Sequence, residues 1–179
     1  YSRIIHDSGE HLMSLVRDLL DISKIEAGRL TICAEPFHAP DVIASSVDTL
    51  RPAIEAKGIA FDVTIADDLG EISADRRACK QMLVNLLANA CTFTERGRIE
   101  VRIERDRLVL EDTGIGMDAG ALQRAFDPFF RVDPDQLSGK GMGLSIVRRL
   151  GERFGWPVSL ESQPGKGTIA TIRFGDENA

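Results

Sequence analysis

Two stretches in which apolar and polar residues alternate follow one another at residues 98–112, RIEVRIERDRLVLED. Alternation with a period of two puts every second side chain on the same face of a β-strand, so each stretch predicts a strand with one buried face. The two predicted strands lie on either side of Asp106. Strands that are buried on one face need a second layer to cover them, and this requirement limits the possible folds.

The rest of the chain supplies further strands and several helices. Apolar spacing and capping residues predict helices at residues 40–57, about 75–91 and 141–154, with Asp75 as the cap of the second. Further strands are predicted at residues 30–37, 59–65, 157–162 and 167–174, and a long loop at residues 117–140. Strands grouped with helices, without strict β-α-β alternation, favour an α+β fold in the form of a two-layer α/β sandwich.

Residues 2–27 have the pattern of a long helix from a helical bundle. Six side chains recur at alternating spacings of three and four, namely Ile5, Ser8, Leu12, Leu15, Leu19 and Ile22. A lone helix of this kind is only marginally stable in water, so it needs partner helices from other sequence or from a second copy. Gly28 is expected to cap it. The predicted organisation is a helical segment at 1–28 and a compact domain at 29–179.

Composition restricts the partners and the compartment. The net charge is −6, the pI is near 5.1 and no basic run stands out, so we expect no binding of nucleic acid. Cys33, Cys79 and Cys91 show no CxxC spacing and are expected to be small buried residues of a reduced, cytoplasmic protein. No apolar stretch reaches the roughly 20 residues that cross a bilayer. The chain begins inside a helical pattern, so we expect a fragment of a parent that could be membrane-anchored.

The sequence NLLAN at residues 85–89 puts two asparagines on one face of a predicted helix. Asn85 and Asn89 are four residues apart, so their amides project from the same side. An asparagine amide oxygen is a hard, neutral ligand that suits Mg²⁺. Two surface or capping asparagines would give the same pattern, so this motif alone leaves both interpretations open.

The sequence EDTGIGM at residues 111–117 follows a predicted strand. Asp112 ends that strand, and Gly114 and Gly116 follow at alternate positions. A carboxylate beside backbone that carries no side chains can accept a hydrogen bond from an exocyclic amine such as that of adenine. An ordinary turn that contains an aspartate is the alternative.

Two more motifs follow in the loop-rich part of the chain. The sequence FDPFFR at residues 126–131 has three phenylalanines, which suit the apolar anchor of a mobile lid or the core packing of a long loop. In SGKGMGLS, residues 138–145, three glycines lead into a predicted helix, where bare amides and the helix dipole suit phosphates. Taken in this order, the four motifs could hold the metal, base, lid and phosphates of one nucleotide.

Together these motifs resemble the ATP-binding catalytic domain of two-component sensor histidine kinases, of the GHKL superfamily. NLLANA, DTGIGM, FDPFFR and GKGMGLS resemble its N, G1, F and G2 boxes, and GKGT at residues 165–168 resembles its late Gly-Thr motif. Residues 8–28, SGEHLMSLVRDLLDISKIEAG, resemble the second helix of the dimerisation and phosphotransfer hairpin. The resemblance implies the Bergerat fold, a mixed sheet with helices on one face, and ATP and Mg²⁺ as cofactors.

The resemblance also implies a role for individual residues. Asn89 would ligate Mg²⁺, with Asn85 near the phosphates or the metal shell. Asp112 would bind the adenine amine, Gly114 and Gly116 would let the base approach the backbone, and Thr168 would support the base from the opposite strand. The lid and phosphate contacts would come from Phe129, Arg131, Gly139, Lys140, Gly141, Met142, Gly143 and Leu144.

The sequence departs from the family pattern near the metal. The family usually has a lysine three residues after the metal-binding asparagine, where this chain has Thr92. Lys140 stands where the family often has threonine, and we expect it to supply the missing cation. ATPases of the superfamily carry a water-activating glutamate four residues before the metal-binding asparagine, and Asn85 at that position cannot take a proton.

The implied reaction is transfer of the ATP γ-phosphate to a protein histidine and then to an aspartate in the receiver domain of a response regulator. His6 and Asp7 are similar to a phosphoacceptor pair, but SKIEAG begins only 17 positions after His6, which leaves no room for the hairpin. The acceptor is therefore expected before Tyr1, on the same or the partner protomer of a homodimer, and this chain should not phosphorylate itself. Alternatives are a nucleotide-binding regulatory or phosphatase-biased scaffold and a GHKL-type ATPase.

Overall fold

The computed structural model describes residues 33–131 and 141–174, together with Gly9, Met13, Val16 and Leu20. The chain forms two compact units, Tyr1–Thr31 and Ile32–Ala179. In the first unit the four described residues are helical. The side chains predicted to form its seam, the cap at Gly28 and the predicted boundary at 28–29 lie outside the described residues. No helix in the described part of the chain is long and apolar enough to span a bilayer.

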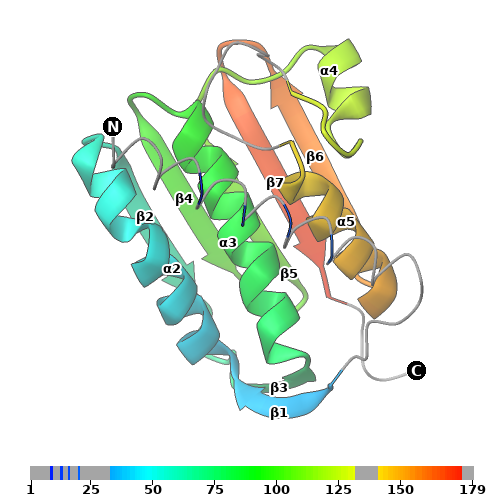
Figure 1. The fold of residues 1–179 in the computed structure, drawn as a ribbon. Coiled ribbons are helices and arrows are strands. Elements are labelled where there is room, and N and C mark those ends of the chain that lie inside the picture. Colours follow the sequence, from blue (N-terminus) through cyan, green and yellow to red (C-terminus); the bar gives the residue numbers. More distant parts are fainter. Residues whose placement is uncertain are drawn as a thin grey trace. The chain divides into compact units, whose positions relative to one another are not determined.

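A five-stranded mixed sheet forms one layer of the second unit (Figure 1). Its strand order is β2-β4-β5-β7-β6. The pair β2–β4 is parallel and the other three pairs are antiparallel. The strands are β2 (Ala60–Ile65), β4 (Arg98–Ile103), β5 (Arg107–Asp112), β6 (Val158–Gln163) and β7 (Gly167–Arg173). The two strands predicted around Asp106 are β4 and β5, so the alternating pattern that requires a covering layer belongs to the centre of the sheet.

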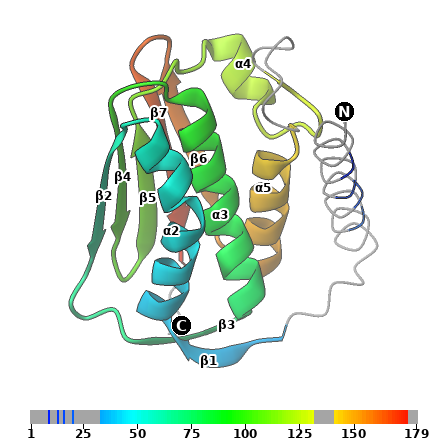
Figure 2. The same cartoon turned by 60° about the vertical axis from the view of Figure 1, so that its left-hand side comes forward.

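Three helices form the second layer and lie side by side on one face of the sheet (Figure 2). They are α2 (Ala39–Ala56), α3 (Arg76–Phe93) and α5 (Gly143–Phe154), and α3 lies between the other two. Apolar side chains of both layers meet in a core whose largest fully buried members include Ile54, Met82, Leu87, Ile99, Leu110, Ile146 and Leu150. The predicted α+β sandwich with a mixed sheet and helices on one face is confirmed.

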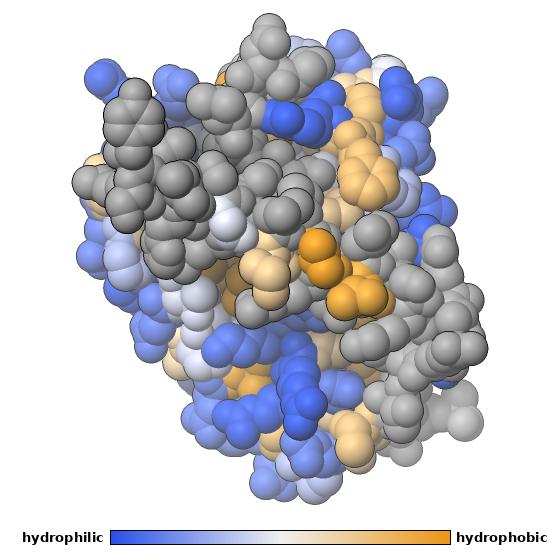
Figure 3. Space-filling view, viewed as in Figure 1, coloured by the Kyte–Doolittle hydropathy of each residue, from blue (hydrophilic) through white to orange (hydrophobic). Residues whose placement is uncertain are grey.

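The helix α2 has an apolar face toward the sheet and a charged face toward solvent. Its inward face buries apolar residues such as Val42, Val47 and Ile54, whereas Asp48 and Glu55 are exposed on the outward face. Figure 3 shows the edge of the molecule formed by α2 as mainly hydrophilic. A helix with an apolar stripe and a charged face is held by burial of that stripe against the sheet.

The first residue of α3 is fixed by the cap that the sequence predicts. The Asp75 carboxylate accepts hydrogen bonds from the amides of Arg77 at 3.0 Å and Ala78 at 3.1 Å. These are two of the four amides that a helix leaves without an internal partner at its N-terminus. The cap therefore defines where the central helix begins.

Some local elements differ from the sequence-based predictions. β1 (Glu35–His38) begins later than the predicted strand and pairs with β3 (Glu71–Ala74), a strand that was not predicted. Within the predicted loop at 117–140, α4 (Ala119–Arg124) forms a short helix capped by Asp118. Neither β3, with four residues, nor α4, with no buried residue, has enough apolar periodicity to be recognised.

The cysteines only partly match the expectation that all three are buried. Cys91 is buried and Cys79 is half-buried, but Cys33 is exposed because it precedes β1 at the edge of the domain. Burial raises the pKa of the Cys79 thiol to about 12, with a further contribution from the nearby negative charge of Asp75. The Cys79 thiol therefore stays protonated at neutral pH and is a poor nucleophile.

Gly151 gives a test of how tightly α5 packs. Alanine usually stabilises a helix by about 1 kcal/mol relative to glycine, but a Cβ here would lie 2.5 Å from the carbonyl oxygen of Trp156 and 2.7 Å from Cγ2 of Val158. We expect Gly151→Ala to lower the free energy of unfolding by about 1–3 kcal/mol. Urea unfolding followed by the fluorescence of Trp156, the single tryptophan, measures this change.

The matched control is Gly120→Ala in α4. A Cβ at Gly120 would have its nearest neighbour at 3.5 Å, which is an ordinary contact. This control should leave the free energy of unfolding unchanged or slightly raised. An equal loss in both variants would contradict the packing explanation for Gly151.

Candidate functional site

A cavity lies between α3, the start of α5 and the ends of β5 and β7, with the segment 115–131 along one side. Many of the predicted site residues line it although they are far apart in the sequence. These are Asn89, Asp112, Gly116, Arg131, Gly141, Gly143, Leu144 and Thr168. Most of the remaining wall is apolar and comes from Leu86, Ala90, Phe93, Leu110, Ile115, Met117, Ala125, Phe130, Leu160 and Ala170.

Asp112 is a buried acid at one end of this cavity. It is the last residue of β5, lies opposite Thr168 of β7 and is only 7% exposed. Burial raises the pKa of this carboxyl above its ordinary value, while the backbone amides of Gly114 and Thr168 act in the opposite direction. The Gly114 amide donates to Oδ1 at 2.8 Å. A carboxylate has about four acceptor positions, so Asp112 keeps capacity for a donor from a ligand.

Ser162 is a site residue that the sequence did not reveal. Its hydroxyl donates to the carbonyl of Gly167 at 2.8 Å and accepts from the amide of Met117 at 2.8 Å. Its oxygen lies 2.9 Å from Oγ1 of Thr168, and since the Ser162 proton is already used, the Thr168 hydroxyl is the donor in this pair. Ser162 therefore fixes the orientation of the Thr168 side chain. The Thr168 hydroxyl oxygen is then left as an acceptor toward the cavity. A lone serine in a strand carries no signal of this role.

The two predicted asparagines of α3 lie next to the start of α5. A Cβ on Gly143 would lie 3.5 Å from Nδ2 of Asn89 and 3.7 Å from Cβ of Asn85, so this glycine keeps the space beside both side chains open. The Asn85 Nδ2 is buried and has no hydrogen-bond partner in the described part of the chain. An unsatisfied buried donor costs about 1–3 kcal/mol, and an oxygen of a bound ligand would remove that cost.

Arg131 presents a second buried donor without a partner. Its side chain lines the cavity, and Nη2 is buried with no hydrogen-bond acceptor among the residues that the structure describes. Among the described residues that line the cavity, it is the one with a positive charge. An anionic group would supply both the charge and the acceptor that this guanidinium lacks.

The glycines at 114, 116 and 141 allow close contacts within the protein itself. A Cβ at Gly116, where φ is 65°, would lie 1.9 Å from the Gln163 carbonyl oxygen. A Cβ at Gly114 would lie 2.4 Å from the carbonyl oxygen of Phe93. At Gly141, where φ is 66°, a Cβ would lie 2.7 Å from the carbonyl oxygen of Phe130. These glycines are required by backbone packing around the cavity, whereas the resemblance implied space for the ligand.

Comparison with known proteins agrees with this geometry. Residues 74–178 match the family described as histidine kinase-, DNA gyrase B- and HSP90-like ATPases. The chain belongs to this ATPase family. The match extends from the start of α3 past the end of β7, so it contains every described residue that lines the cavity.

Similar proteins include histidine kinases. The chain is 39% identical to an uncharacterized sensor-like histidine kinase of Rhizobium meliloti, over 96% of this chain and 34% of the relative. It is 35% identical to the histidine protein kinase DivJ of Caulobacter vibrioides, over 97% of this chain and 30% of DivJ. The chain thus spans about a third of the length of these relatives.

Solved structures give the same result for the fold. Full-length ShkA in complex with AMPPNP superposes with a TM-score of 0.84 and 29% identity, over 94% of this chain and 36% of ShkA. The histidine kinase AdeS of Acinetobacter baumannii has a TM-score of 0.81 at 22% identity, over 98% of this chain and 84% of that one. The predicted resemblance is confirmed: the chain is an ATP-binding catalytic domain of the histidine kinase type.

Some residues of the F and G2 boxes that were expected to contact the nucleotide do not line the cavity. Phe129 is 59% exposed and does not line the cavity, whereas its neighbour Phe130 does. The ring of Phe130 lies 4.6 Å from the guanidinium of Arg124 at the end of α4, which is a cation–π contact. Met142 is 1% exposed and belongs to the core, so its side chain does not face the cavity. Gly139 and Lys140 lie outside the described residues.

The F and G2 boxes are joined by one backbone contact. The amide of Phe129 donates to the carbonyl of Gly141 at 2.8 Å, and Phe129 has a φ of 65°. A bulky residue with positive φ costs free energy, and this contact holds it there. The Gly141 carbonyl therefore already has a donor within the protein, two residues before α5 begins at Gly143.

Asp112→Asn tests the cost of the buried acid. Because the folded-state pKa is raised, the folded protein holds this proton more tightly than the unfolded chain. The stability that comes from this proton is fully present below the unfolded pKa, and it is lost as the pH rises through the folded pKa. We expect the nucleotide-free variant to be at least as stable as wild type at neutral pH and to lose this pH dependence, as measured by urea unfolding between about pH 4 and 7. A clear loss of stability at neutral pH would contradict this explanation.

The same variant should lose affinity for nucleotide. Asparagine offers the adenine amine a neutral oxygen and a competing NH₂ group, so we expect binding of Mg-ATP to weaken roughly 10- to 100-fold. Calorimetric titration at neutral pH measures this, with Gly120→Ala as the control. Unchanged affinity would show that Asp112 does not contact the base.

Proposed function

We propose that this domain binds Mg-ATP in the cavity and transfers the γ-phosphate to a histidine that lies outside the chain. The observation that carries the proposal is a pair of buried donors that have no partner among the described residues. Arg131 Nη2 lies in the wall of a cavity whose other end holds a buried acid, and Asn85, with its Nδ2, lies beside the cavity-lining Gly143. A nucleotide has both kinds of group in one molecule. Its base supplies an amine for the acid, and its phosphates supply oxygens for the donors.

The proposed orientation of the nucleotide follows from α3. Phe93 at the end of this helix lies beside Gly114 and so close to Asp112, whereas Asn89 and Asn85 lie one and two turns earlier, beside Gly143. The adenine would therefore lie between β5 and β7, against the apolar wall. The phosphates would lie toward the asparagines and Arg131, near the first amides of α5.

The residues present fit a magnesium ion. The Asn89 amide lines the cavity, and Gly143 leaves space beside it. Asn89 would hold Mg²⁺ through its side-chain oxygen, as the hard oxygen ligands of this ion require. When bound, Mg²⁺ neutralises charge on the phosphates, which is the main demand of phosphoryl transfer. Asn85 and Arg131 would orient the phosphate oxygens and neutralise their remaining charge.

Transfer to another protein fits the cavity better than hydrolysis. Asp112 is the one carboxylate among the described residues that line it, and two backbone amides already bond this group at the base end. Position 85 carries an amide, which cannot take a proton from water. We therefore rank a GHKL-type ATPase below a kinase. A nucleotide-binding scaffold without catalysis remains the second alternative for the experiment below.

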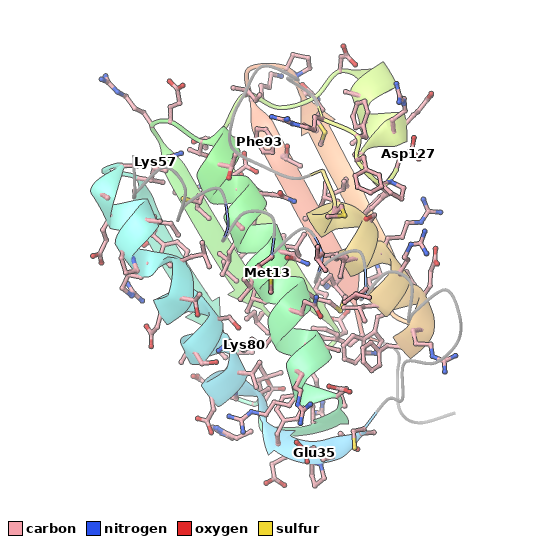
Figure 4. The ribbon with its side chains drawn as sticks, viewed as in Figure 1. Met13, Glu35, Lys57, Lys80, Phe93 and Asp127 are labelled. Carbon is pink, nitrogen blue, oxygen red and sulfur yellow. The ribbon has the colours of Figure 1, made fainter. Side chains whose placement is uncertain are left out.

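The proposed partners are other helices and a receiver domain. Met13, Val16 and Leu20 recur at spacings of three and four, and they are 44–55% exposed (Met13 is labelled in Figure 4). A helix with such an apolar stripe needs a partner, which supports a bundle formed by a homodimer of the longer protein. The histidine would lie on a helix of that bundle, and a response regulator would receive the phosphoryl group. Because ATP is the donor, we place the reaction in the cytoplasm.

A transfer assay tests the function. We expect labelled ATP to bind the chain without labelling it, and to give acid-labile label on a separately made helical hairpin that carries the acceptor histidine. Asn89→Ala should reduce transfer at least tenfold, because the metal loses its protein ligand, while Lys80→Ala at an exposed position of the same helix should not. Label on His6 would overturn the assignment of residues 1–28, and tight binding without transfer would favour the scaffold.

Lys140 has a separate test. The family's usual lysine is replaced by Thr92, and we propose that Lys140 supplies the cation instead. Lys140→Ala should weaken binding of Mg-ATP several-fold by calorimetry, and the loss should shrink as salt is raised. If the affinity survives unchanged, Arg131 is sufficient and the compensation proposed for Lys140 is wrong.

A further inference from the structure

The C-terminal end of α3 is held by a side chain from another helix. The last four carbonyls of a helix have no partner within it unless the flanking backbone or a side chain supplies one. The carbonyl of Ala90 accepts from the amide of Thr94, which leaves those of Cys91, Thr92 and Phe93. The first two of these lie within reach of the same ammonium group.

That group belongs to Lys57, which caps the end of α2. Its Nζ donates to the carbonyl of Cys91 at 2.5 Å, to that of Thr94 at 3.2 Å and to that of Thr92 at 3.4 Å. Figure 4 shows Lys57 and Phe93 at the same end of the two helices. All three donor positions of the ammonium group are thus directed at one turn of backbone, and its charge lies at the negative end of the α3 dipole.

The remaining carbonyl of this turn connects α3 to the G1 box. The Phe93 oxygen accepts from the amide of Ile115 at 3.1 Å, and a Cβ at Gly114 would lie 2.4 Å from the same oxygen. The amide of Gly114 in turn donates to Asp112. A shift of the last turn of α3 would therefore move the backbone donor of the acid that we propose to bind adenine.

The same turn also bears on the metal end of the site. Asn89 lies one helical turn before Phe93 and two residues before Cys91, the first residue of α3 whose carbonyl Lys57 binds. Lys57 itself does not line the cavity. Its effect on the site must therefore be transmitted through the backbone of α3, and it reaches the residues at both ends of the nucleotide.

We propose that Lys57 is a positioning residue that sets the register of α3 for nucleotide binding. By fixing the final turn, Lys57 holds Asn89 and the G1 box at the separation that one nucleotide requires. This inference rests on the proposed contacts of Asn89 and Asp112 with Mg-ATP. It assigns Lys57 no contact with the nucleotide.

The test compares the two ends of the same helix. Lys57→Met removes the donors at the C-terminus of α3, and Asp75→Ala removes the cap at its N-terminus, so both should lower the melting temperature. Only Lys57→Met should weaken binding of Mg-AMPPNP, by roughly tenfold, because Asp75 lies about five turns away from Phe93. Calorimetry on the 179-residue chain, well below both melting temperatures, measures the affinity with Mg²⁺ and with EDTA.

Two further variants separate positioning from simple stability. Lys57→Arg offers several N–H donors to the same carbonyls and should restore most of the affinity. Lys57→Gln keeps a shorter, neutral donor and should give an intermediate loss, which provides a usable variant if Lys57→Met does not fold. A weaker affinity for Mg-AMPPNP, with a smaller change in EDTA, would indicate that the metal end is displaced.

Hydrogen exchange gives a readout that does not depend on binding. The Ile115 amide, which donates to Phe93, should exchange faster in Lys57→Met and at the wild-type rate in Asp75→Ala. The proposal fails if Lys57→Met binds Mg-AMPPNP like wild type, or if Asp75→Ala weakens binding equally. If wild type itself does not bind Mg-AMPPNP, the proposed function fails first, so the two failures are distinguishable.

Discussion

The packing of α3 between α2 and α5 is the constraint on which the site depends. This helix is buried along its length through side chains such as Met82, Leu86 and Leu87, and it lies against the central strands of the sheet. Its start is fixed by Asp75, and its end is fixed by Lys57 and by the amide of Ile115. Because it is held at both ends and buried between them, the side chains on its cavity face have defined positions without any ligand.

Polar groups at and beside the cavity are buried in a way that lowers the stability of the ligand-free domain. Asp112 is buried with a raised pKa, and buried donors on Asn85 and Arg131 have no partner among the described residues. Each of these groups costs stability in the free protein. A ligand that satisfies all three would recover that cost, so the same arrangement that destabilises the free domain favours binding of a nucleotide. Function and stability are in opposition at these positions.

Features that depend on residues close together in the sequence could be predicted, whereas features that depend on distant residues could not. Alternation over many residues predicted β4 and β5, and the cap at Asp75 predicted the start of α3, because both depend on neighbours within a few positions. The pairing of β1 with β3 joins segments that are more than 30 residues apart, and neither has a strong local pattern. The same limit applies to the choice between Phe129 and Phe130, since backbone torsion decides which ring faces the cavity.

The amino-acid sequence by itself determined the fold class and the set of residue types that a nucleotide site needs, because periodicity, caps and short motifs are encoded locally. The resemblance of its motifs to a known family predicted that Asn89, Asp112, Arg131 and Thr168 belong to one site, and all four line the same cavity. Only the tertiary structure decided why several glycines are required, which hydroxyl orients Thr168 and which lysine holds the end of α3. These depend on contacts between segments that are brought together when the sheet and the helical layer pack, and no local pattern records such contacts.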